Sequence, residues 1–184
     1  MCEKDFLSKG RDYEFYCFGT SRIFEKRAQK LKTLRTWITF LGIVTPVIVG
    51  GAVLSFGSDK NILPYFLFIA GVVGLVQLTL STWAIVARWD ERYEYAVDAL
   101  RVNTDLYNKW KSYCEIDPEN KKLFKTLQSE YEIQEIKDIG QTISDKEKRF
   151  ANRESLKYYK KECHLCNSIP ITSKPEKCDG CGNY

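Results

Sequence analysis

The chain has 184 residues, of which 28% are charged, and a formal net charge of +4 at pH 7. Together with a mean hydropathy of −0.34, these totals suit one or two small soluble domains, and they exclude a chain that is apolar throughout. The average is misleading, because the charged residues are segregated along the sequence.

Residues 1–35 are predicted to form an N-terminal helix, since apolar side chains such as Phe15, Ile23 and Leu31 recur at loosely helical intervals. The second half of this segment is strongly basic. Its cations are Arg22, Lys26, Arg27, Lys30, Lys32 and Arg35.

Two uncharged runs follow, at 36–56 and 62–87, separated only by a short turn around Asp59 and Lys60. A helix needs about 20 apolar residues to cross roughly 30 Å of hydrocarbon, and both runs reach that length. A pair of core helices in a soluble protein is the alternative. Two such runs placed back to back instead favour a transmembrane hairpin over 36–87, with Asn61 capping its second helix and Pro64 in the first turn.

The basic residues on either side of the hairpin predict its orientation. Arg88, Arg92 and Arg101 follow the second run, whereas the turn carries only Lys60. Because Lys and Arg near membrane spans stay on the cytoplasmic side, both chain ends are predicted to be cytoplasmic. Indole rings favour the interface, and three lie near the ends of the runs: Trp37, Trp83 and Trp89. The positive charge is therefore attributed to anchoring at the lipid bilayer, and a nucleic-acid partner is not expected.

Small and polar residues form one stripe on the second run, because they recur at alternating steps of four and three. They are Ala70, Gly74, Gln77, Ser81, Ala84 and Arg88. On the first run, Gly42, Pro46 and Gly50 fall at steps of four. Helix packing is the favoured interpretation, since small residues let helices approach closely in lipid. The alternative is a pore. The candidate residues for either role are Thr45, Gly74, Gln77 and Ser81, and Pro46 is interpreted as a static bend rather than a gating hinge.

Residues 88–142 are predicted to form amphipathic cytoplasmic helices, the first of which continues the second span without a break. Its apolar stripe is Val86, Trp89, Tyr93, Val97, Leu100, Thr104, Tyr107 and Trp110. Such a face needs a partner, which is either the N-terminal helix or another copy of the chain. A second helix is predicted to start with Asp117 as cap and Pro118 in the first position, and to end before Gly140.

Residues 143–162 are predicted to be a basic helix, opened by a capping box of Ser144 and Glu147. Its basic residues outnumber its acids. They are Lys146, Lys148, Arg149, Arg153, Lys157, Lys160 and Lys161. A solvated face is the favoured interpretation, and binding to phosphate groups is the alternative.

Two CxxC pairs occupy the tail at 163–184: Cys163 with Cys166, and Cys178 with Cys181. Two tight turns that each carry two thiolates complete a tetrahedral site, so these four cysteines are predicted to hold one zinc ion per chain in a zinc-ribbon or knuckle. Iron uses similar ligands and stays an alternative. Disulfides are disfavoured in a reducing cytoplasm, and a thioredoxin-like pair lacks its βαβ context.

Three further cysteines and the single histidine are not assigned to this site. They are Cys2, Cys17, Cys114 and His164. The cysteines are interpreted as small apolar fillers, and His164 as an exposed residue of the first turn. A tail with few apolar residues cannot build its own core, so the metal is expected to order it.

The sequence as a whole resembles the SLATT family: an N-terminal helix, a two-span hairpin with a very short turn, and a long amphipathic helix. The tail resembles the SLATT branch found on mobile elements and named for its CxxC-x(11)-CxxC signature. The resemblance implies an all-α membrane protein of the bacterial inner membrane. It also implies an effector of conflict or anti-phage defence systems that oligomerises and permeabilises the membrane when a sensor protein or nucleotide second messenger activates it.

The alternative function is an adaptor that does not permeabilise the membrane and whose zinc tail docks a protein or nucleic-acid partner. An enzyme is not expected, because no catalytic constellation or phosphate-binding loop is present and a site with four thiolates has no open coordination position.

Overall fold

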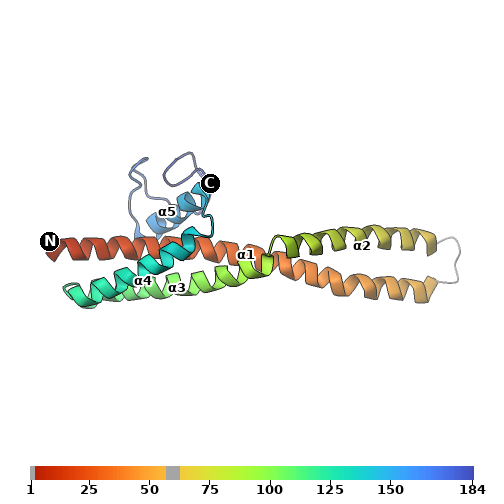
Figure 1. Cartoon of the computed structure of the whole chain (residues 1–184). Coiled ribbons are helices and arrows are strands. Elements are labelled where there is room, and N and C mark those ends of the chain that lie inside the picture. Colours follow the sequence, from red (N-terminus) through yellow and green to blue (C-terminus); the bar gives the residue numbers. More distant parts are fainter. Residues whose placement is uncertain (1–2, 57–62) are drawn as a thin grey trace. The chain divides into compact units, whose positions relative to one another are not determined.

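The computed structural model describes residues 3–56 and 63–184. Within these ranges the chain is all-helical, without strands, which confirms the predicted helical class. The helices are α1 (Glu3–Phe56), α2 (Leu63–Val86), α3 (Trp89–Ile116), α4 (Lys121–Ile139) and α5 (Asp145–Tyr159) (Figure 1). The predicted turn around Asp59 and Lys60, the proposed Asn61 cap and Cys2 lie outside the described residues.

The chain divides into two compact units, which are described separately. The first, called the helical unit below, comprises residues 1–27 and 95–184. The second, called the apolar hairpin, comprises residues 28–94. Helices α1 and α3 each contribute to both units.

The core of the helical unit lies between the N-terminal part of α1, α3 and α4. Its buried members are Cys17, Leu106, Trp110, Tyr113, Cys114, Phe124 and Leu127. The ring of Tyr13 on α1 stacks on Trp110 at a centroid distance of 4.7 Å. Cys17 and Cys114 are buried in this core, as expected of small apolar fillers.

Helix α3 buries a face that coincides only in part with the predicted stripe, since Trp110 belongs to both. The buried residues step by three and four along the helix, and they are Ala96, Ala99, Asn103, Leu106, Trp110 and Tyr113. Val97 and Thr104 of the predicted stripe are exposed instead. The buried face is displaced by one position from the predicted stripe, because the small residues Ala96 and Ala99 and the bonded Asn103 occupy the contact with the neighbouring helices.

A buried carboxylate joins α3 to α4. Asp138 accepts hydrogen bonds from the Tyr95 hydroxyl at 2.7 Å, the Asn103 amide at 2.9 Å and the Gln134 amide at 2.8 Å. Burial raises the pKa of Asp138, and these three donors oppose that shift. The network explains why the polar residue Asn103 occupies a core position of α3.

The starts of α4 and α5 illustrate two kinds of cap. Asn120, not Asp117, caps α4, and its side chain accepts from the Leu123 amide, so the predicted start at Asp117 and Pro118 was three residues early. The predicted capping box of α5 is confirmed: Ser144 and Glu147 exchange their hydrogen bonds. Helix α5 ends at Tyr159, before the predicted residue 162, because Lys160 takes a left-handed conformation with φ of 50°.

In the apolar hairpin, the stripe of small and polar residues is the least solvent-exposed face of α2. The half-buried positions include Ala70, Gly74, Gln77, Ser81 and Ala84. On α1, half-buried residues include Ile38, Gly42, Thr45, Val49 and Ala52. These two sets share the 3–4 stepping of antiparallel coiled-coil seams. The contact between α1 and α2 follows that stepping, so Pro46 and Gly50 are exposed, which corrects the predicted four-step stripe on α1. Helix α1 runs through Pro46 without a break.

Helix α2 does not continue into α3, which corrects the predicted unbroken helix. Helix α2 ends at Val86, and a turn at Ala87 and Arg88 precedes α3. Arg88 has φ of 53°, a left-handed conformation that interrupts a right-handed helix. At the same end of the hairpin, Arg35 of α1 pairs with Asp90 of α3 at 2.7 Å and lies over the Tyr93 ring.

Candidate metal centre

The two CxxC segments fold into turns with matching hydrogen bonds. The Asn167 amide donates to the Cys163 carbonyl at 2.8 Å, and the Gly182 amide donates to the Cys178 carbonyl at 2.8 Å. Asn167 accommodates a left-handed φ of 50°. Position 182 requires glycine because the backbone of Glu176 lies so close that a β-carbon there would be 2.3 Å from the Glu176 carbonyl oxygen. The equivalent turns present two thiols each toward a common centre.

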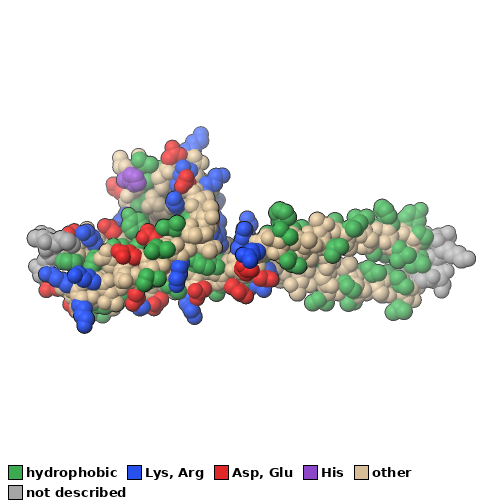
Figure 2. Space-filling model, viewed as in Figure 1, with side chains coloured by type: hydrophobic (Ala, Val, Ile, Leu, Met, Phe, Trp, Pro, Cys, Tyr) green, Lys and Arg blue, Asp and Glu red, His purple; other side chains and the backbone are tan. Residues whose placement is uncertain are grey.

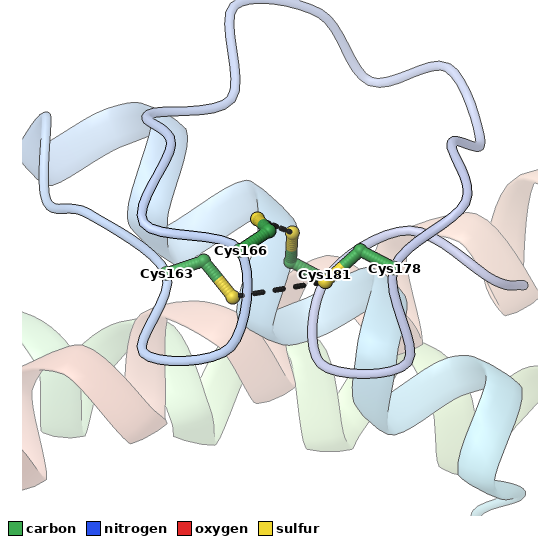
Figure 3. A group of neighbouring side chains, drawn as sticks. All are labelled: Cys163, Cys166, Cys178 and Cys181. Atoms are coloured by element: carbon green, nitrogen blue, oxygen red, sulfur yellow. Dashed lines mark hydrogen bonds between the residues drawn. The ribbon is translucent and has the colours of Figure 1, made fainter.

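The four thiols of these turns converge (Figure 3). All four Sγ atoms lie within 4.8 Å of one another. Cys163 and Cys178 are 3.9 Å apart, and Cys166 and Cys181 are 3.8 Å apart. A tetrahedral ion with Zn–S bonds of about 2.3 Å separates its sulfur ligands by about 3.8 Å. A disulfide would need about 2.05 Å, so the geometry fits a metal ion and not a pair of disulfides.

The electrostatics of the cluster also favour a cation. Burial raises the pKa of the Cys181 thiol, and the neighbouring thiols raise it further. By contrast, the Ser168 hydroxyl donates to the exposed Cys166 sulfur at 3.3 Å and lowers the pKa of that thiol to about 6. Four thiolates cannot occupy so small a volume without a counter-charge, whereas a divalent ion stabilises all of them in the deprotonated state.

Helix α5 supports the second turn and the loop before it. The Arg153 guanidinium donates to the Thr172 carbonyl at 2.7 Å and to the Glu176 carboxylate at 2.6 Å. Its side chain is fully buried, which corrects the predicted solvated face at this one residue, whereas Lys146, Lys148, Lys160 and Lys161 are exposed as predicted. Sequence reasoning missed Arg153 because its partners lie in an irregular loop, where periodicity gives no signal.

A cavity of about 790 Å³ lies within the helical unit, between α1, α4, α5 and the first turn of the tail. Asp138 and Asn103 line it, together with Tyr131, Leu156 and the exposed side chain of His164.

The four residues predicted for a pore or for helix packing do not line this cavity. Thr45, Gly74, Gln77 and Ser81 are half-buried in the apolar hairpin.

Comparison with known families matches residues 8–184 to the model described as "Mobilome CxxCx(11)CxxC protein". The spacing in that description is the spacing of the metal centre, with eleven residues between Cys166 and Cys178. The chain belongs to this family. No curated protein and no solved structure matched it. In this member of the mobilome CxxCx(11)CxxC family, the signature cysteines are those that the fold gathers into one cluster.

Proposed function

We propose that this protein is a membrane effector that permeabilises the bacterial inner membrane, with the α1–α2 hairpin as its spanning part. The exposure of the apolar residues carries the spanning part of the proposal. Both candidate spans have a mean hydropathy of 2.0 or above, and no residue of their most apolar windows is buried. A core helix of a soluble protein would be covered by other elements. Figure 2 presents these hydrophobic side chains on the surface of the hairpin, and a bilayer is the environment that would cover them.

The proposed orientation places both chain ends in the cytoplasm. Its support is the basic residues beside the spans, including Arg35, which pairs with Asp90, and Arg88 in the turn after α2. Trp37 and Trp83 are exposed near the ends of the apolar segments, as expected for rings at the membrane interface.

We further propose that the metal centre is a structural zinc site. Four thiolates complete its coordination and leave no position for a substrate, so the protein is not expected to be an enzyme. The apparent free energy with which small structural sites bind zinc, about 10–16 kcal/mol, already includes the cost of ordering the chain. The ion would therefore order a tail that has little apolar surface of its own.

The effector role rests on the resemblance to SLATT proteins and on the mobile-element family to which the chain belongs. In this proposal, copies of the chain oligomerise when a sensor protein or nucleotide signal acts on the cytoplasmic part. In the single chain, Gln77 lies against Gly42, so its amide faces the seam of the hairpin. The stripe thus serves packing first, and a water path along it would require α1 and α2 to separate on activation.

An adaptor is the second candidate, and exposed apolar residues in the tail favour it. Leu165, Ile169 and Ile171 are exposed, the last to 88%. Such side chains beside an ordered metal site suit the docking of a partner protein.

Membrane depolarisation separates the two functions. The fluorescence of a potential-sensitive dye would be followed in cells after induction of the full chain together with its genomic neighbours. A Cys166→Ser, Cys181→Ser double variant would be compared at an equal amount of protein in the membrane fraction. The effector proposal predicts depolarisation by the wild-type chain. An unchanged potential at equal membrane content would contradict permeabilisation and favour the adaptor.

A further inference from the structure

Helix α5 has one face that packs on α1. The Ser155 hydroxyl donates to the Phe15 carbonyl at 3.0 Å, and the Tyr159 hydroxyl donates to the Glu14 carboxylate at 3.0 Å. A β-carbon on Gly19 would lie 2.8 Å from the Ser155 oxygen, so the two helices approach closely there. Glu147 at the start of α5 also pairs with Arg27 of α1 at 2.6 Å, so this face follows α1 from Glu14 to Arg27.

A second face of α5 binds the tail through backbone carbonyls. Arg149, Asn152 and Arg153 are spaced as neighbours on one helix face. The Arg149 guanidinium donates to the Asn183 carbonyl at 2.9 Å, and the Asn152 amide donates to the Gly180 carbonyl at 2.8 Å. Both acceptors lie in or directly after the second CxxC turn. This turn therefore depends on α5 for its position as well as on its thiols.

Arg153 is the centre of this second face. Besides its bonds to Thr172 and Glu176, its guanidinium donates to the Cys181 carbonyl at 3.3 Å. It thus joins the loop between the two CxxC pairs to a metal-ligating residue. A fully buried guanidinium needs all of these partners, because an unpaired buried charge is costly.

The thiols also share a hydrophobic cluster with both helices. Leu156 of α5, Cys163 and Cys181 are buried together, and Phe15 of α1 and Cys178 pack against them. The contact between α1 and α5 and the contact between α5 and the metal centre are therefore parts of one cluster. Loss of the geometry at the thiols would remove packing partners from Leu156 and Phe15.

We propose that Arg153 is the positioning residue of the metal centre, and that metal occupancy strengthens the docking of α5 on α1. The proposal rests on the structural metal site proposed above and not on membrane permeabilisation. Without an ion, the two CxxC turns lose their common anchor, and the carbonyls that receive Arg153 lose their positions. Helix α5 then loses the partner of one face. Because α5 forms a wall of the 790 Å³ cavity, a loosened α5 would open that wall.

Metal affinity of the full chain in detergent tests the role of Arg153, measured by competition with a chromophoric zinc chelator. Arg153→Met is expected to weaken zinc binding by about 10-fold to 100-fold, the range typical of residues that orient metal ligands. Glu176→Gln is expected to show a smaller loss, since the carbonyl bonds of Arg153 persist. Lys146→Met is the matched control, because this exposed α5 residue has no partner in the described part of the chain.

Hydrogen exchange of the unmodified chain tests the second half of the proposal and does not depend on how a variant folds. Removal of zinc by a chelator under reducing conditions should speed exchange in residues 145–159, while residues 121–139 of α4 keep their protection. Unchanged exchange in α5, or equal zinc affinity of Arg153→Met and Lys146→Met, would overturn the proposal. A failed depolarisation experiment affects neither readout.

Discussion

The side-chain amide nitrogen of Gln77 lies 3.2 Å from the point that a β-carbon of Gly42 would occupy. The one central amide of α2 is therefore directed at a glycine on α1. Because Gly42 has no side chain, the polar group is accommodated inside the hairpin seam rather than on its apolar surface. This relationship makes the hairpin a packed pair of helices whose stability can be measured.

Substitutions at this contact should separate tolerated from disruptive changes. Gly42→Ala is expected to be tolerated, since only the flexible end of Gln77 must shift. Gly42→Leu should lower the thermal unfolding midpoint in detergent, because its side chain needs the space that Gln77 fills. Gln77→Leu should cost about 0.6 kcal/mol and less than about 2 kcal/mol. Gly50→Leu is the control, as no atom lies within 4 Å of its β-carbon position. Equal midpoints for Gly42→Leu and Gly50→Leu would contradict the packing.

The ion pair between Arg27 and Glu147 should give the helical unit an acid-sensitive contribution to stability. Burial raises the pKa of Glu147, but hydrogen bonds from Arg27 and Ser144 outweigh it and lower that pKa to about 2. A carboxyl group whose pKa is lower in the folded than in the unfolded state stabilises the fold at pH values above its unfolded pKa, here 4.5. That contribution is lost as the pH falls from about 4.5 toward 2.

Glu147→Gln tests this sign. The variant should be less stable than the wild type at pH 7, and the difference should shrink as the pH falls below about 4.5. Chemical unfolding of both proteins across that pH range measures it, with Lys148→Gln as a control at an exposed neighbour. A difference that stays constant with pH would assign the loss to packing instead of charge.

Elemental analysis tests the metal centre. The purified chain should contain one zinc ion, because four thiolates fill one tetrahedral site. The double variant with Cys166→Ser and Cys181→Ser should lose the metal, whereas Cys114→Ser, in the core of the helical unit, should retain it. Full metal content in the double variant would refute the ligand set, and iron in place of zinc would correct the choice of metal.

Local sequence rules predicted some of these features well. Ser144 and Glu147 lie three residues apart, so their capping box was readable from the sequence, and so was the CxxC spacing that brings four thiols together. The buried face of α3 was not readable from the sequence, because Asn103 occupies a core position only through its bond to Asp138 on another helix. Arg153 was likewise hidden, since its burial depends on carbonyls of an irregular loop. Pairings distant in sequence decide both cases, and periodicity does not report them.

Membrane topology decides whether α1 and α2 cross the bilayer with both chain ends in the cytoplasm. Dual reporter fusions, active as a fluorescent protein only in the cytoplasm or as a phosphatase only in the periplasm, would be placed after Tyr184 and within residues 57–61. We expect fluorescence at Tyr184, phosphatase activity within residues 57–61, and a chain that resists extraction from membranes by alkaline carbonate. Phosphatase activity at Tyr184 would contradict the orientation, and release of the chain by carbonate would contradict the transmembrane hairpin itself.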